Sequence, residues 1–145
     1  MKTISFRQDM IDLILAGKKT LTLRPIKPQP VRVELAGLFG RPGYVWKGVD
    51  LCDMHDWLVK QCPYGDVGDV VCVLELERSV RLSIMDVDVK KLNFVDYDTW
   101  YRDGVDSDSI VRDKIVSRWD SFYGLTPYSW DWNPFVWVIR FEVVK

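Results

Sequence analysis

The stretch GKKTLTLRP, residues 17–25, decides how the fold of this chain is predicted. Apolar residues at helical spacing precede it, which predicts a helix over Arg7–Ala16. Gly17 fits the end of that helix, because glycine adopts the left-handed conformation without steric cost. Thr20–Arg24 then alternates polar and apolar side chains, as a strand with one buried face does. Pro25 ends the strand, so the stretch predicts a helix, a tight turn and a strand in succession.

The polar face of this strand carries the first candidate site. Alternation places Thr20, Thr22 and Arg24 on one face and packs Leu21 and Leu23 behind them. A row of two hydroxyls and a guanidinium is typical of an anion-binding surface, and it is equally typical of a solvated strand face. The residues alone leave both interpretations open.

Lys19 lies at the turn into the strand, where it can lean over the polar row. Burial or a neighbouring cation such as Arg24 disfavours the charged form of a lysine, which can then act as a base. A threonine hydroxyl is a weak nucleophile until a base takes its proton. Lys19, Thr22 and Arg24 therefore form a candidate nucleophilic or anion-binding group.

The rest of the chain predicts an α+β domain, because the regular strand–helix alternation of a parallel doubly wound sheet is absent. Further strands are predicted from β-rich runs, over Thr3–Phe6, Val70–Glu75, Val80–Val89 and Phe135–Val143. The alternation slips near Met85 and Asp86, which predicts a bulge. Prolines and glycines interrupt residues 26–68, which is expected to be either a functional loop or a segment with short elements over Val31–Leu35 and Asp53–Lys60.

Two helices are predicted before the last strand. Asp96 is the expected cap of a short helix that ends at Gly104, and Asp106 or Ser107 of a longer one that Gly124 stops. The apolar face of the longer helix is expected to comprise Ile110, Ile115, Trp119 and Phe122.

Length and composition restrict the class of protein. The 145 residues fit a single domain, 1–145, and a net charge of −1 excludes a globally basic protein that coats nucleic acid. No apolar run reaches membrane-spanning length and no signal core follows the N-terminus, so we expect a cytoplasmic protein without a membrane partner. The odd set Cys52, Cys62 and Cys72 does not predict a disulfide scaffold.

Three segments carry a resemblance to a known family. ILAGKKTLTLRP, CPYGDVGDVVCVLE and the pair SRWDSFYG and WDWNPFVWVIRFE resemble ASCH domains of the PUA-like superfamily, in particular those of phages and prophages. The resemblance covers most of the chain, with residues 31–61 matching least. It implies a small PUA-like β-barrel of mixed strands with flanking helices, and a cleft between barrel and helices.

The resemblance also implies site residues. One small bacterial ASCH protein is an amidohydrolase of acetylcytidine nucleosides that uses a Lys, a Thr and a Glu. The first two match Lys19 and Thr22, and the nearest acid in the corresponding text, DYDTWYRDGV, is Asp103. Ligand contacts are expected from the remaining signature residues and one aromatic residue near the last strand: Lys18, Thr20, Arg24 and Trp132.

Two other groups of residues have a weaker functional interpretation. Cys52, His55 and Cys62 have zinc-like spacing but lack a fourth ligand, so neither a metal nor another cofactor is expected. Trp130 and Trp132 could stack on a base, although large aromatic residues more often plug the end of a barrel.

Three functions follow from the sequence. The first is a domain that binds RNA, a nucleotide or a modified nucleoside in a cleft lined by Lys, Thr and Arg. The second is an amidohydrolase with Lys19 as base, Thr22 as nucleophile and Asp103 as supporting acid. The third is a phage protein-interaction module that binds a host protein through its tryptophan-rich end. The ligand and the oligomeric state do not follow from the residues.

Overall fold

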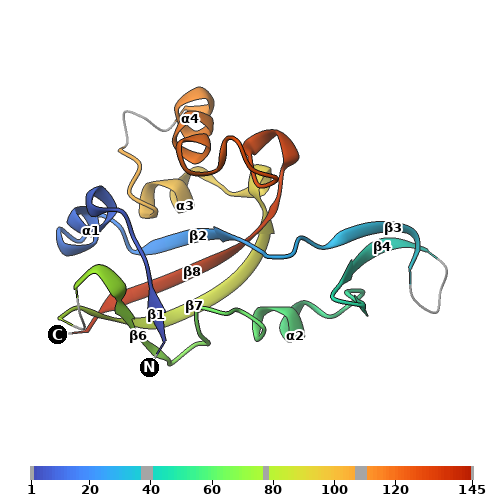
Figure 1. The fold of residues 1–145 in the computed structure, drawn as a ribbon, viewed down its shortest axis with the longest axis horizontal. Helices are drawn as coiled ribbons and strands as arrows, with labels where there is room; N and C mark the ends of the chain where they lie inside the picture. Colours follow the sequence, from blue (N-terminus) through green and yellow to red (C-terminus); the bar gives the residue numbers. More distant parts are fainter. Residues whose placement is uncertain (1, 37–40, 77–78, 107–110, 145) are drawn as a thin grey trace.

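The computed structural model describes residues 2–36, 41–76, 79–106 and 111–144, which form an α+β fold with two sheets (Figure 1). The larger sheet has the order β1-β6-β7-β8-β2. Its strands are β1 (Thr3–Ile4), β6 (Val70–Val73), β7 (Arg81–Lys91), β8 (Phe135–Val143) and β2 (Leu21–Pro25). Only β1 and β6 pair in parallel in this sheet, and the other neighbours are antiparallel. The predicted mixed sheet is confirmed.

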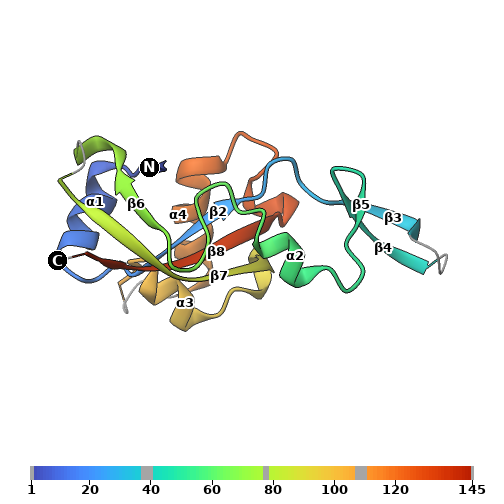
Figure 2. The ribbon, with the colours of Figure 1, turned by 90° about the horizontal axis from the view of Figure 1, so that it is seen from below.

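The second sheet has three short strands and projects from the body of the molecule (Figures 1 and 2). It consists of β3 (Val31–Ala36), β4 (Arg41–Trp46) and β5 (Val49–Asp50) in that order. The short helix α2 (His55–Val59) returns the chain to the larger sheet. The interrupted stretch after Pro25 therefore contains the two short elements that were expected.

The larger sheet does not close into a barrel, contrary to the prediction. Its edges are β1 and β2, which pair only with β6 and β8 respectively. β1 is two residues long, too short to give β2 a second ladder. A side chain spans the opening instead, because Arg24 Nη2 of β2 donates to the backbone carbonyl of Ser5 at 2.5 Å.

The register of β2 buries its leucines as predicted. Leu21 and Leu23 join a core formed with the two helices α3 (Tyr97–Arg102) and α4 (Arg112–Tyr123). β8 is buried on both faces, because Val136 belongs to this core and Trp137 to the core on the opposite face. The layer of α3 and α4 thus covers one face of the sheet beside β2 (Figure 1).

Local signals place several element ends correctly. The Asp96 carboxylate accepts from the Thr99 N–H at 2.8 Å and caps α3. The register of β7 against β8 shifts between Ile84 and Asp86, which confirms the bulge. Gly17 has φ +76°, the left-handed conformation expected after α1 (Gln8–Leu15).

The start of α4 differs from the prediction. Val111 occupies its N-cap and provides no side-chain hydrogen bond, so Asp106 is not the cap. Ser107 and Ile110 lie outside the described residues. Ile115 and Trp119 are buried as predicted, but Phe122 is 37% exposed. Phe122 lies at the edge of the apolar face, where the Arg7 guanidinium packs 3.6 Å from its ring centroid. Predicted strand Val70–Glu75 also ends early, since Leu74–Leu76 forms a 3₁₀ turn.

Candidate functional site

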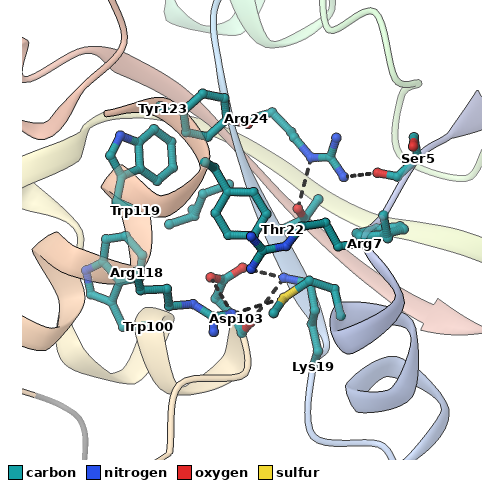
Figure 3. A pocket seen from close by; sticks show the side chains of 14 residues that line it. Ser5, Arg7, Lys19, Thr22, Arg24, Trp100, Asp103, Arg118, Trp119 and Tyr123 are labelled. Atoms are coloured by element: carbon teal, nitrogen blue, oxygen red, sulfur yellow. Dashed lines mark hydrogen bonds and ion pairs between the residues drawn. The ribbon is translucent and has the colours of Figure 1, made fainter. Parts of the chain in front are cut away.

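A cavity of about 190 Å³ lies between the open edges of the larger sheet and the helices α3 and α4 (Figure 3). Two segments of it flank the sheet opening, Ser5–Arg7 after β1 and Thr22–Arg24 in β2. The other lining residues come from the helices and their flanks: Met10, Lys19, Trp100, Asp103, Arg118, Trp119, Phe122 and Tyr123. The cavity therefore collects residues from segments that are distant in sequence.

A buried ion pair forms the polar floor of this cavity. Lys19 Nζ donates to Asp103 Oδ1 at 2.5 Å and to the Asp103 backbone carbonyl at 3.1 Å. The two residues are only 3% and 7% exposed. Asp103 caps the C-terminus of α3, and Gly104 follows at φ +100°. A Cβ at Gly104 would lie 2.9 Å from Leu13 Cδ1, so this glycine lets the end of α3 approach α1.

Arg118 from α4 completes the polar floor. Its Nη2 donates to the Asp103 backbone carbonyl at 2.8 Å and lies 3.4 Å from Asp103 Oδ2. The same nitrogen lies 3.2 Å from Met10 Sδ. Arg118 therefore does not belong to a solvated helix face, and its side chain is only 20% exposed. A signal was present, because Arg118 follows buried Ile115 by three residues and so borders the apolar face of α4.

The environment of Lys19 lowers its pKa. Desolvation by burial is the largest cause, and the nearby charges of Arg118 and Arg24 act in the same direction. The Asp103 carboxylate opposes them by its charge and its hydrogen bond, without cancelling the net decrease. The neutral amine of Lys19 is therefore more accessible than that of an ordinary lysine.

Thr22 and Arg24 form the wall beside this floor. The Thr22 hydroxyl accepts from Arg24 Nε at 3.2 Å, and Arg24 also donates to the Ser5 carbonyl. Among the described residues, no direct hydrogen bond joins Lys19 to Thr22, because each is bonded to a different partner. One cavity thus brings together Lys19, Thr22, Arg24 and Asp103. The Lys19 amine and the Thr22 hydroxyl do not form a hydrogen bond with each other among the described contacts.

Aromatic rings make up the remaining wall. Trp119 and Tyr123 lie one helical turn apart on α4, with ring centroids 4.5 Å apart. Phe6 also lines the cavity, and the Arg24 guanidinium lies 4.9 Å from its ring centroid. Burial raises the pKa of the Tyr123 phenol, which stays protonated as a hydrogen-bond donor at neutral pH. The cavity therefore has one aromatic wall, beside a polar floor and the polar wall of Thr22 and Arg24.

The Glu75 carboxylate fixes Ser5 and Phe6, two residues that line the cavity. Its carboxylate accepts from the Ser5 hydroxyl at 2.6 Å and from the Phe6 N–H at 3.0 and 3.1 Å. Burial alone would raise the pKa of Glu75, but these hydrogen bonds outweigh it and lower the pKa. Glu75 was not among the predicted site residues, because its partners lie about seventy positions away in sequence.

Three predicted ligand contacts do not line the cavity. Lys18 is exposed at the end of α1. The Thr20 hydroxyl is buried with no hydrogen-bond partner among the described residues. Trp132 lies in the 3₁₀ turn Trp130–Trp132 and is 72% exposed, so it neither plugs the end of the sheet nor reaches the cavity. Trp130 is half-buried and packs against Trp100, with centroids 6.2 Å apart.

The zinc-like residues are dispersed. Cys62 is buried in the core, and His55 Nε2 lies 3.0 Å from Asp88 Oδ1. No cluster of three or more metal-ligating side chains occurs within the part of the chain that the structure describes. In the same part, no helix combines the length and apolar character needed to cross a membrane.

Comparisons with known proteins bear on the fold. No family model matches the sequence, and no curated protein sequence matches it. Protein EF3133 from Enterococcus faecalis V583, a DUF984 protein, is similar in structure with a TM-score of 0.53 and 15% identity, over 99% of this chain and 80% of that protein. An ASCH domain from Lactobacillus crispatus JV V101 is similar with a TM-score of 0.51 and 15% identity, over 97% of this chain and 79% of that domain. This chain therefore has an ASCH-like fold.

Proposed function

We propose that the cavity binds one nucleoside unit, as a nucleoside, a nucleotide or a segment of RNA. One observation carries the proposal: a single cavity combines an aromatic wall with a polar floor of hydrogen-bonding and charged groups. A nucleobase has a π-face that stacks on aromatic rings and a polar edge that needs hydrogen bonds. The rings of Phe6, Trp119 and Tyr123 suit the face, and Arg24 suits the edge or an attached phosphate.

The charge of the cavity supports a polar or anionic ligand. The cavity lining contains four cations, Arg7, Lys19, Arg24 and Arg118, and one carboxylate, Asp103, which pairs with Lys19 and Arg118. Arg24 has no carboxylate partner among the described ion pairs and bonds only to a hydroxyl and a carbonyl oxygen. A ligand oxygen can replace the Ser5 carbonyl as its acceptor without leaving a buried charge unpaired.

Calorimetric titration with cytidine, cytidine monophosphate and acetylcytidine tests this proposal. Saturable binding that Arg24→Ala weakens by about tenfold or more supports it, since a hydrogen bond to a charged group contributes about 1.5–3 kcal/mol. Lys18→Ala serves as the matched control, because Lys18 is an exposed cation outside the cavity. Absence of binding by all three ligands contradicts the proposal and favours a protein-interaction module.

A second candidate function is hydrolysis of the amide of an acylated cytidine. The specific observation in its favour is a buried lysine of lowered pKa beside a buried threonine hydroxyl and a carboxylate. A lysine with a lowered pKa reaches its neutral, proton-accepting form at a lower pH than an ordinary lysine, and the carboxylate of Asp103 can orient it. Binding alone does not require this buried pair.

The reaction would proceed through a threonine ester. Thr22 Oγ1 attacks the acyl carbonyl carbon while its proton passes to the neutral Lys19 amine. The bond from that carbon to the exocyclic nitrogen breaks, and Lys19 returns the proton to the leaving amine. Water then hydrolyses the ester and releases the carboxylic acid. The reaction requires the Lys19 amine to exchange a hydrogen bond with Asp103 for one with the Thr22 hydroxyl. Catalytic hydrogen bonds often tighten only when ligand is bound.

Chromatographic release of cytidine from acetylcytidine tests this candidate separately from binding. Turnover that both Lys19→Met and Thr22→Val abolish supports the amidohydrolase. Binding of acetylcytidine with no release of cytidine leaves nucleoside binding as the function and excludes the hydrolase.

A further inference from the structure

The base of the β3–β4 hairpin carries four cations that have no carboxylate partner among the described residues: Lys27, Arg32, Lys47 and Lys91. We call these four residues the basic patch. Like charges gathered without neutralising acids repel one another, so an anionic partner stabilises them. The overall net charge of −1 makes this local excess more distinct.

The patch is fixed to the larger sheet. Gln29 donates to the backbone carbonyl of Phe135 at 2.9 Å and accepts from its N–H at 2.8 Å, which anchors the segment between Lys27 and Arg32. Trp46, next to Lys47, donates from Nε1 to the Pro28 carbonyl at 2.7 Å. The hairpin base is therefore held in place beside the start of β8.

Aromatic rings lie between the cations of the patch. Arg32 pairs directly with Tyr44 across β3 and β4. The Lys91 ammonium lies 5.4 Å from the Tyr44 ring centroid and 5.2 Å from that of Phe135, and the two rings form an edge-to-face pair at 4.9 Å. Lys27 lies 5.2 Å from the Tyr128 centroid. Cations interleaved with partly exposed rings are what single-stranded nucleic acid binds, through its phosphates and its bases.

The chain connects the patch to the cavity. Arg24 lines the cavity, and Lys27 follows it by three residues along the segment that leads into β3. Three residues span at most about 10 Å, and the chain bends at Lys27 and Pro28. Figure 1 shows this segment running from β2 to the projecting hairpin. A ligand that extends from the cavity in this direction meets Lys27 first and Arg32 next.

The nearby carboxylates do not neutralise the patch. Asp50 of β5 accepts from the Cys52 N–H at 3.0 Å, and Glu34 lies two residues beyond Arg32 on β3 without an ion pair to it. Neither carboxylate forms an ion pair with a cation of the patch among the described residues.

We propose that the basic patch holds the phosphodiester backbone of a single-stranded nucleic acid, one nucleotide of which occupies the cavity. The second half of this statement rests on the proposed function of the cavity. The first half stands on the patch alone, so the two can fail separately. The patch extends recognition from one nucleoside to a strand.

Fluorescence anisotropy with labelled single-stranded RNA and DNA of about eight nucleotides, a length within the range of such sites, tests the proposal. The strand should bind more tightly than cytidine, and the logarithm of its affinity should fall with the logarithm of salt concentration. For single strands each neutralised phosphate contributes about −0.7 to this slope. The double variant Arg32→Gln/Lys91→Gln should reduce the slope by about 1.4 and weaken binding by about tenfold at low salt.

The control removes two cations from the other end of the sheet. Lys2 and Arg81 both lie beside Cys72, and Arg81 is at the opposite end of β7 from Lys91. Lys2→Gln/Arg81→Gln changes the net charge equally and should leave the slope unchanged. The pair Arg32→Lys/Lys91→Arg keeps both charges and should keep the slope. Tighter binding of RNA than of DNA identifies ribose as a second determinant, and equal binding assigns recognition to the shared backbone.

Three results would overturn the inference: a strand that binds no more tightly than cytidine, equal losses in the patch and control variants, or equally tight binding of polyglutamate. Cytidine binding that persists in those cases leaves the cavity proposal intact. Strand binding that depends on the patch but is insensitive to Arg24→Ala overturns the claim that a nucleotide of the strand occupies the cavity, and leaves the patch as the strand's site.

Discussion

Lys19 and Asp103, 84 positions apart, form a buried ion pair in which the lysine bonds both the carboxylate and the backbone carbonyl of the aspartate. The pair joins the entry of β2 to the end of α3, and Arg118 joins α4 to the same carbonyl. Two helices and the sheet edge therefore meet at one residue, Asp103. Both the shape of the cavity and its charge depend on this junction.

Loss of one member of the pair should cost more stability than loss of both. Asp103→Asn leaves Lys19 and Arg118 without a carboxylate, and breaking a buried pair in this way costs about 3–5 kcal/mol. The double variant Lys19→Met/Asp103→Leu removes both charges and should unfold at a higher urea concentration than Asp103→Asn. Urea unfolding followed by circular dichroism measures the difference. Equal or additive losses would contradict the account of a buried, mutually dependent pair.

Stability should rise with pH in mildly alkaline solution, because the folded-state pKa of Lys19 lies below its unfolded value of about 10.5. Between those two values the unfolded chain binds more protons than the folded protein, so the free energy of unfolding increases with pH. Urea unfolding at a series of pH values below 10 should show this increase for the wild type relative to Lys19→Met. Measurements stop below pH 10, because the folded-state pKa of Tyr123 is raised. Above that pH its titration makes the free energy of unfolding fall as pH rises. Parallel profiles for the two proteins would show that Lys19 is not desolvated.

Replacing Arg24 by lysine should not restore ligand binding. Arg24 donates from two different nitrogens, to Thr22 and to Ser5, and a lysine ammonium cannot reproduce that planar fork. We expect Arg24→Lys to bind cytidine about as weakly as Arg24→Ala, roughly tenfold below wild type. Calorimetric titration measures both, with unfolding temperature as the control for folding. Full binding by Arg24→Lys would mean that charge alone is recognised.

Glu75→Gln should weaken ligand binding without direct contact to the ligand. The carboxylate positions Ser5 and Phe6, and a neutral amide forms weaker hydrogen bonds with the same donors. Because the folded pKa of Glu75 is lowered, its contribution is present above the unfolded pKa and is lost as pH falls through the folded pKa. The affinity of the wild type for cytidine should therefore converge on that of Glu75→Gln at acidic pH. A constant ratio at all pH values would assign the effect of the variant to packing.

Much of this architecture follows from local patterns. The alternation of Thr20–Arg24 predicts which side chains of β2 face the helices, and the structure buries Leu21 and Leu23 accordingly. The strand predicted over Phe135–Val143 has the same bounds in the structure, because the turn residues before it and its apolar alternation mark its two ends. Asp96 forms its cap through a contact three residues away, which a sequence displays directly.

The parts that sequence patterns miss depend on contacts between distant segments. Barrel closure is wrong because it depends on whether β1 is long enough to pair with β2, which no local signal determines. Arg118 and Glu75 act on partners that only folding brings near. Trp132 was assigned to the ligand from residue type alone, and its exposure depends on how the turn Trp130–Trp132 leaves the core.

Backbone amide NMR during a titration with cytidine tests most directly the claim that this cavity binds a nucleoside. The account predicts saturable shift changes grouped at Phe6, Thr22–Arg24, Asp103 and Trp119–Tyr123, which surround the cavity. The same titration of Arg24→Ala should require about tenfold more cytidine to reach the same changes. Shift changes confined to other surfaces, such as the 3₁₀ turn at Trp132, or no saturable change at all, would contradict it.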